Sequence, residues 1–299
     1  MNKYERNALA LNRLNLGDFK DAQVLFSENV QKFPDCLTFN NLGYYYYQFG
    51  IYQKNGNLHS AKKLGLHYLL KAAAQKENPI TLNAIAEVYF TLQDHKTALR
   101  YYVLSLQKQD DIFIKYNIGV CQYCIKDYNA AIITFRALIN NAEAIISNGG
   151  THPQLACAFC YAAASNADDG KAALAEYCIT ENTSTEADVF ILRVIFRQFE
   201  LAYFNIEEVL KQWYPTDELI AALAECILHL PNKLQSSEYQ RVQELCGERK
   251  FVLLRAIRNP AWRMQVFRKL ALYPVLIKRC CYYGCKMHNV PNPLSAQNM

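Results

Sequence analysis

The sequence predicts an all-α fold built from repeated helix pairs. The 299 residues are 52% hydrophobic but include only 11 glycines and 9 prolines, so turns are scarce and long helices are favoured over a many-stranded sheet. Apolar residues recur at spacings of three and four. One such pattern also repeats along the first half of the chain, since 33 positions separate Ala86 from Gly119 and Ala98 from Ala131. A period of this length is typical of stacked helical repeats.

Each repeat contains two recognisable helical stretches. The first carries an apolar residue followed by a small one, which lets two helix axes approach closely. The second carries an aromatic ring or histidine, an alanine and another aromatic ring at helical spacing. The first stretches contain Leu42-Gly43, Ile85-Ala86 and Ile118-Gly119, and the second stretches lie in 16–35 (Phe19, Ala22, Phe26), 93–106 (His95, Ala98, Tyr102) and 126–139 (Tyr128, Ala131, Phe135).

This pattern resembles the tetratricopeptide repeat, an antiparallel helix pair of about 34 residues. The resemblance covers residues 3–145 as four repeats and implies a right-handed superhelix of antiparallel helix pairs, a solenoid whose first helices line the concave face. From Gly43 to Ala86 there are 43 positions, so we expect an insertion near 48–60 in the second repeat. A degenerate fifth helix pair is expected at 153–182.

The remainder of the chain is expected to be helical but irregular. Residues 186–290 form a predicted basic helical region, in which Thr216 and Ser236 are typical of helix starts. This region either continues the superhelix as irregular pairs or docks against it as a bundle. Residues 291–299 are expected to form a frayed tail.

Four consecutive tyrosines, Tyr44 to Tyr47, cannot all belong to one buried stripe, because successive residues of a helix point around its circumference. The resemblance implies that Tyr46 faces the second helix of its own pair and that Tyr45 packs toward the neighbouring repeat. It turns Tyr44 and Tyr47 toward the groove.

Asparagines recur one turn before these groove positions. An amide side chain offers both a donor and an acceptor, which matches the alternating N–H and C=O groups of an extended peptide. The resemblance implies that they bind a peptide backbone, so we expect a protein or peptide partner, whose identity the sequence does not give. Alternatively, the chain's own C-terminal helices occupy this groove. The candidate peptide-binding residues are Asn7, Asn40, Asn41, Asn83 and Asn117, with Tyr44, Tyr47, Phe90 and Tyr123 as apolar contacts.

Charge is distributed unevenly along the chain. The net charge is +5, yet residues 249–299 carry ten basic and no acidic side chains. Basic residues interleaved with Trp262 and Phe267 suggest an alternative role at nucleic acid or another anionic surface. A solvated helix face, or pairing with the acidic body, explains the same pattern. The residues concerned are Arg255, Arg258, Arg263, Arg268 and Lys269.

Eleven cysteines, an odd number, indicate free thiols, and the N-terminal residues lack a secretory pattern. We therefore expect a cytoplasmic protein without a transmembrane segment. The pairs Cys121/Cys124 and Cys157/Cys160 lie within predicted helices, where core packing is favoured over metal binding. The cluster Cys280, Cys281, Cys285 and His288 leaves metal binding or acylation open. We expect no metal and no cofactor.

Nothing in the sequence matches a nucleotide-binding, metalloprotease or nucleophile-elbow motif. We therefore expect a non-catalytic scaffold, an adaptor, chaperone or regulator, that binds an extended peptide or protein segment in its groove. A nucleic-acid-associated factor that uses the basic 249–286 region is the main alternative. An enzyme with an unrecognised site is the third.

Overall fold

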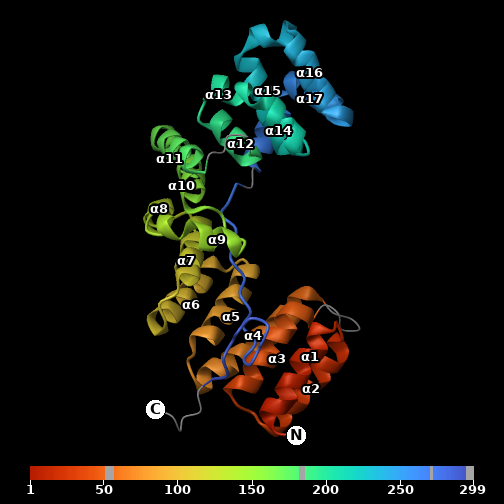
Figure 1. Cartoon of the computed structure of the whole chain (residues 1–299), viewed down its shortest axis with the longest axis vertical. Helices are drawn as coiled ribbons and strands as arrows, with labels where there is room; N and C mark the ends of the chain where they lie inside the picture. Colours follow the sequence, from red (N-terminus) through yellow and green to blue (C-terminus); the bar gives the residue numbers. More distant parts are fainter. Residues whose placement is uncertain (51–56, 182–185, 270–271, 294–299) are drawn as a thin grey trace. The chain divides into compact units, whose positions relative to one another are not determined.

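The structure, a computed structural model, describes residues 1–50, 57–181, 186–269 and 272–293, and it confirms the all-α prediction. All regular elements within these ranges are helices. The chain divides into two compact units, each treated separately below. Unit 1 comprises residues 1–127 and 276–299, and unit 2 comprises residues 128–275 (Figure 1).

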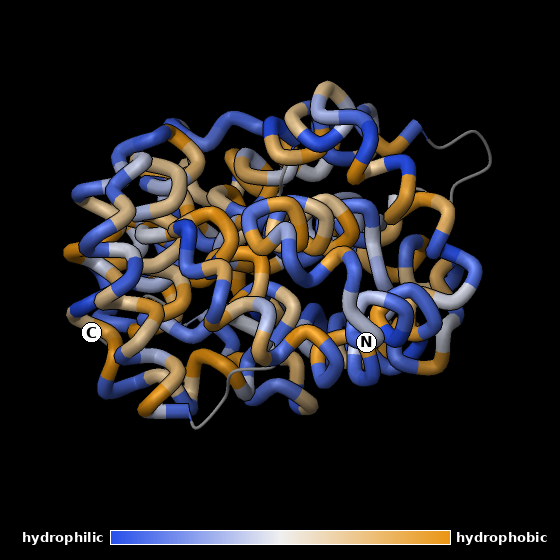
Figure 2. The backbone as a smooth tube through the Cα atoms, turned by 90° about the horizontal axis from the view of Figure 1, so that it is seen from above, coloured by the Kyte–Doolittle hydropathy of each residue, from blue (hydrophilic) through white to orange (hydrophobic). Residues whose placement is uncertain are grey.

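Unit 1 consists of successive helix pairs. α1 packs on α2, α3 on α4 and α5 on α6, and each pair also contacts the next helix along the chain. The tube in Figure 2 alternates between hydrophobic and hydrophilic residues, as amphipathic helices require. The helices are α1 (Lys3–Asn15), α2 (Phe19–Lys32), α3 (Cys36–Phe49), α4 (Leu58–Gln75), α5 (Pro79–Thr91), α6 (His95–Lys108) and α7 (Ile112–Cys124).

The same local signal starts every helix of unit 1. An Asn or Asp precedes each helix, and its side-chain oxygen accepts a hydrogen bond from a backbone N–H of the first turn. These N–H groups have no partner within the helix, so the capping side chain fixes where the helix begins. The capping residues are Asn2, Asp18, Asp35, Asn57, Asn78, Asp94 and Asp111.

Two glycines allow α3 and α4 to approach closely. A Cβ atom at Gly43 would lie 2.8 Å from the carbonyl oxygen of Gly65, and one at Gly65 would lie 2.7 Å from that of Gly43. Neither distance is tolerable for a real Cβ, so any larger residue must push the helices apart. The prediction of a small residue at the helix contact is confirmed at Gly43.

All four tyrosines of the run are buried, because neighbours surround α3 on every side. Tyr45 donates a hydrogen bond to the carbonyl of Phe19 in the preceding pair, at 2.7 Å. Tyr46 stacks on Tyr68 of α4, with ring centroids 5.8 Å apart. These placements agree with the expected directions. The predicted insertion at 48–60 lies partly outside the described residues, which omit 51–56.

Unit 2 is an irregular helical array around its own apolar core. Thr216 and Ser236 cap α15 and α16, as predicted. Contrary to prediction, however, the helical region does not continue to residue 290, since the last helix ends at Arg268. The helices are α8 (Tyr128–Arg136), α9 (Ala142–Ser147), α10 (Pro153–Ala163), α11 (Ala167–Thr180), α12 (Ala187–Ile195), α13 (Phe199–Phe204), α14 (Ile206–Gln212), α15 (Asp217–His229), α16 (Ser237–Leu245), α17 (Lys250–Arg258) and α18 (Pro260–Arg268), with short 3-10 turns at Ile139–Asn141, Pro231–Gln235 and Gly247–Arg249.

Among the described residues, no single helix has the length and apolar character needed to cross a membrane. One bent pair, Tyr128–Arg136 with Ile139–Ser147, meets the length and composition test when taken together.

Candidate functional site

The chain's own C-terminal segment lies across the first helices of unit 1. This segment, residues 276–293, is called the tail below. It is extended between residues 276 and 282 and then enters turns, and Figure 1 shows it in blue beside α3 and α5. Gly284 and Pro291 disfavour a helix here. The expected groove is therefore occupied by an extended segment of the same chain. The alternative was right that the chain's own C-terminal part fills the groove, but wrong that this part is helical.

Two asparagines each bind both backbone groups of one tail residue. The Asn117 amide donates to the carbonyl of Ile277 at 2.8 Å and accepts from its N–H at 2.9 Å. In the same way, Asn41 donates to the carbonyl of Tyr283 at 3.0 Å and accepts from its N–H at 2.8 Å. Donor and acceptor of one side chain thus pair with one residue of an extended backbone.

Between Asn117 and Asn41, two further side chains each form a single hydrogen bond with the tail backbone. Asn40 donates to the carbonyl of Cys281 at 2.7 Å. The Tyr44 hydroxyl donates to the carbonyl of Arg279 at 2.8 Å. Together with Asn117 and Asn41, these contacts engage tail residues 277, 279, 281 and 283. Every second residue of the tail is held, which is the repeat of an extended strand.

At its far end, the row reaches α1. Asn7 donates to the carbonyl of Tyr283 at 2.8 Å and accepts from the Asn41 amide at 2.6 Å. The tail therefore meets α7 first and α1 last, so it runs against the order of the repeats. Side chains from the first helix of each of the four predicted repeats take part. We refer to Asn7, Asn40, Asn41, Asn83 and Asn117 as the asparagine row.

Buried side chains anchor the tail as well. Ile277, Cys281, Tyr282 and Tyr283 are all nearly inaccessible to solvent. The ring of Tyr282 meets that of Tyr44 edge-on, with centroids 4.8 Å apart, and aromatic pairs prefer this geometry.

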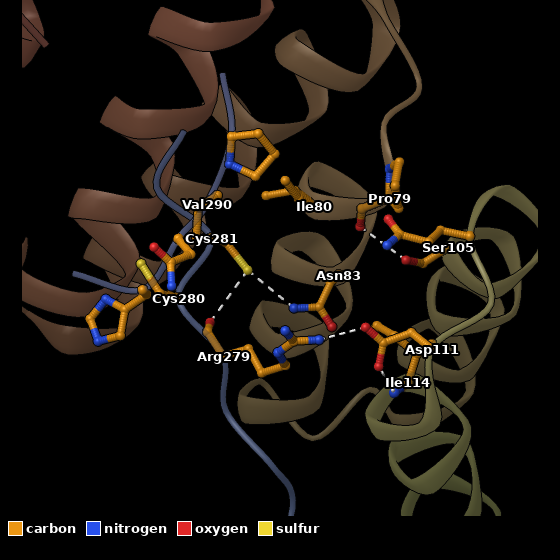
Figure 3. A pocket seen from close by; sticks show the side chains of 14 residues that line it. Pro79, Ile80, Asn83, Ser105, Asp111, Ile114, Arg279, Cys280, Cys281 and Val290 are labelled. Carbon is orange, nitrogen blue, oxygen red and sulfur yellow. Dashed lines mark hydrogen bonds and ion pairs between the residues drawn. The ribbon is translucent and has the colours of Figure 1, made fainter. Parts of the chain in front are cut away.

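Asn83 and Glu87, one turn apart on α5, form the most unusual part of the site. Asn83 donates to Glu87 at 3.1 Å and also points at the Cys281 sulfur at 3.1 Å (Figure 3). The Glu87 carboxylate accepts from the N–H of Arg279 at 3.3 Å. Burial raises the pKa of Glu87 to about 8, although these hydrogen bonds partly oppose the shift. A carboxyl group that stays protonated near neutral pH therefore faces the tail.

The Arg279 side chain points away from the asparagine row and lies at the surface. It forms an ion pair with Asp111, the capping residue of α7 (Figure 3). Its guanidinium lies 4.9 Å from the ring centroid of Phe113. Next to this ion pair is a cavity of about 230 Å³, lined in part by Asn83, Ser105 and Cys281. The tail thus leaves open space beside α5 and α6.

The remaining predicted aromatic residues differ in their surroundings. Tyr47 is buried and packs against Tyr44, with ring centroids 5.7 Å apart. Phe90 packs instead on His95, at 4.7 Å between centroids. Tyr123 is half-buried near the end of α7. Tyr44 and Tyr47 belong to one apolar cluster with Cys281 and Tyr282 of the tail, and a role for Phe90 and Tyr123 in binding an extended segment stays a prediction.

Several residues that contact the tail were not predicted, and Phe113 beside Arg279 and Phe26 beside Tyr282 are two of them. Thr81 lies 3.0 Å from the Tyr283 hydroxyl, oxygen to oxygen, while Glu87 and Asp111 contact Arg279 as described above. Glu87 is four residues after Asn83, hence on the same helix face, and that spacing was an available signal. For Asp111, the sequence indicated only a helix cap and gave no sign of a contact with the tail.

The basic residues of unit 2 do not form one free surface. Arg263 pairs with Glu225 at 3.0 Å and donates to two backbone carbonyls of α17. Trp262 and Phe267 are half-buried and pack in part against the unit 2 core, which limits the ring surface available for base stacking. Of the predicted anionic-surface residues, those that are exposed are Arg255, Arg258, Arg268 and Lys269.

The cysteine pairs within helices pack as expected. Cys121, Cys157 and Cys160 are buried, and burial raises the pKa of each thiol, which is typical of structural rather than reactive cysteines. All eleven cysteines are free thiols in the structure.

No family model and no curated protein matches this sequence. Among solved structures, the chain is similar to a tetratricopeptide repeat protein from Parabacteroides merdae, with 18% identity and a TM-score of 0.59 over 88% of this chain and 99% of that one. The chain has the tetratricopeptide-repeat fold. A structure of Naa15/Naa10 bound to HypK-THB also matches, with 13% identity and a TM-score of 0.45 over 90% of this chain and 39% of that one.

Proposed function

We propose that this chain is a non-catalytic scaffold whose asparagine row binds an extended protein segment. The tail is the intramolecular occupant of this row, and a partner's extended segment competes with it. The single observation that carries the proposal is the hydrogen bonding of tail residues 277, 279, 281 and 283 through their backbone groups.

Recognition through the backbone suits the exchange of one segment for another. N–H and C=O groups are the same in every sequence, so the row places few demands on the side chains of an occupant. Specificity then comes from the few buried anchors, such as Ile277 and Tyr283. A competing segment needs an extended backbone and apolar side chains at corresponding positions.

The polarity of the row also favours an exchangeable occupant. A buried amide is unfavourable unless it is hydrogen-bonded, and a buried backbone needs partners for its own N–H and C=O groups. The asparagines can therefore pair with any extended backbone that offers these groups. Asn40 and Asn41 are wholly buried by the tail and its neighbours. Retaining them makes sense where different backbones must be accepted at the same place.

The test is to separate the tail from the rest of the chain without removing it. A protease site inserted after Tyr273, which is 54% exposed, allows cleavage of the folded protein. A fluorescent peptide corresponding to 276–293 is then added, and anisotropy reports whether it replaces the unlabelled tail. We expect exchange under native conditions, with an affinity reduced about tenfold or more in Asn41→Ala and in Asn117→Ala, since each loses two buried hydrogen bonds to the tail backbone.

Asn12→Ala is the matched control, because Asn12 is an exposed asparagine of α1 and its removal is expected to leave exchange unchanged. A cleaved tail that never exchanges below denaturing conditions contradicts the proposal, as does equal exchange in all variants. If exchange occurs, affinity capture with wild type and with the Asn41→Ala/Asn117→Ala double variant identifies partners that require the row.

A further inference from the structure

Three metal-ligating side chains meet where the tail turns back on itself. The sulfurs of Cys280 and Cys285 and a ring nitrogen of His288 all lie within 4.8 Å of one another. Cys285 Sγ lies 3.2 Å from His288 Nδ1. The sequence analysis expected no metal overall but left metal binding by this stretch open.

Backbone turns produce the convergence. Gly284 adopts a left-handed conformation, with φ of +76°, which glycine accepts without strain. Its N–H donates to the carbonyl of Val290 at 3.1 Å, and the Val290 N–H donates to the carbonyl of Cys285 at 3.0 Å. The loop is thereby closed, and His288 is returned to the side of Cys285. Such turns typically bring the ligands of a zinc site together, whereas cysteine pairs within a helix lack them.

The adjacent cysteine is excluded from the cluster. Cys281 is buried, and its sulfur lies 3.1 Å from the Asn83 amide and 3.4 Å from the carbonyl oxygen of Arg279. Cys280, by contrast, is only half-buried and His288 is exposed. Three of the four candidate ligands in this stretch thus form a cluster that solvent can reach.

We propose that Cys280, Cys285 and His288 bind a zinc ion. Zinc bonds of about 2.3 Å to sulfur and about 2.0–2.1 Å to nitrogen, in tetrahedral geometry, place neighbouring ligand atoms roughly 3.5–3.8 Å apart. The 3.2 Å separation and the upper limit of 4.8 Å for the cluster lie on either side of this range, so we expect small side-chain rotations to complete the site. Two thiolates and an imidazole favour zinc over magnesium or calcium, which prefer oxygen.

A fourth coordination position is available beside the cluster. All three ligand residues line a cavity of about 250 Å³, together with Asn15 and Gln48. A water molecule can take the remaining tetrahedral position there. The zinc would hold residues 280–288 in the looped form, independently of whether the tail exchanges with a partner.

The test uses the full-length chain, reduced and freed of metal by a chelator, and titrated with Co²⁺ as a spectroscopic probe and then with Zn²⁺. We expect one equivalent of Co²⁺ with the absorption of a tetrahedral thiolate site, displaced by Zn²⁺. Cys285→Ser and His288→Ala are expected to weaken binding by more than the ~10–100-fold that loss of an outer-shell partner costs. The control, Cys124→Ser, removes a half-buried thiol outside the cluster and is expected to bind as wild type.

A second readout covers the case in which Cys285→Ser fails to fold. Because His288 is exposed, His288→Ala is expected to keep the wild-type circular dichroism spectrum. Zinc should slow alkylation of Cys280 in the wild type but not in this variant, as followed by mass spectrometry. Absence of stoichiometric metal in the reduced wild type overturns the proposal, as does unchanged binding in His288→Ala. Because neither readout involves peptide exchange, this result is separable from that of the proposed function.

Discussion

Replacing Glu87 with glutamine should remove most of the pH dependence of unit 1 stability. Burial raises the pKa of this carboxyl from an ordinary 4.5 to about 8. The folded form therefore retains a proton that the unfolded form has lost over this interval. A shift of that size corresponds to about 5 kcal/mol of free energy of unfolding, at about 1.4 kcal/mol per pH unit.

The direction follows from which state binds the proton. Since the folded pKa is raised, the stabilisation is fully present below pH 4.5 and is lost progressively as the pH rises to about 8. Glu87→Gln keeps the shape of the protonated acid but does not titrate. The variant and the wild type should therefore have similar stability near pH 5, and the variant should be the more stable at pH 8.5.

Urea unfolding followed by far-UV circular dichroism at several pH values measures this difference. The two tryptophans, Trp213 and Trp262, both lie in unit 2. Their fluorescence therefore follows the other unit in the same samples and serves as an internal reference. Parallel pH profiles for wild type and Glu87→Gln would refute the reasoning, as would a wild type that gains stability between pH 5 and 8.

Three further substitutions test the packing around the tail by chemical denaturation. Asn117→Ala leaves the N–H and C=O of Ile277 unpaired and should cost about 2–5 kcal/mol; a loss within error would mean that the row contributes little. Tyr283→Phe removes the contact with Thr81 and should cost about 1 kcal/mol. Tyr282→Phe removes a buried hydroxyl without a hydrogen-bond partner among the described residues and should be neutral or stabilising. A larger loss of stability in Tyr282→Phe than in Tyr283→Phe would contradict these contacts. Gly43→Ala places a Cβ 2.8 Å from a backbone oxygen of α4 and should cost about 1–3 kcal/mol, so a neutral result would refute the close approach.

The helix pairs were predictable because their signals are local. Small residues such as Gly43 mark close helix contacts, and capping residues such as Asp18 and Asp94 mark where helices begin. Both act within one or two turns and can be read from neighbouring positions. The positions of Asn41 and Asn117 could be predicted for the same reason, since the repeat period places them at equivalent positions of their helices.

The identity of the occupant could not be predicted, because it depends on contacts between distant residues. Asn117 and Ile277 are 160 positions apart. No local pattern in the segment LIKRCCYYG predicts which part of the chain it will contact. Its apolar and aromatic residues suited a helix and an extended strand equally well. The high pKa of Glu87 arises from the same long-range burial and was equally hidden.

The order of synthesis has a consequence for how unit 1 acquires its occupant. Its helices α1 to α7 emerge from the ribosome long before residues 276–293. At about 5–20 residues per second, the roughly 150 intervening residues take on the order of 7–30 s to translate. Throughout that interval the nascent repeats present an empty asparagine row. A cellular partner that binds the chain during its synthesis therefore does not compete with the tail.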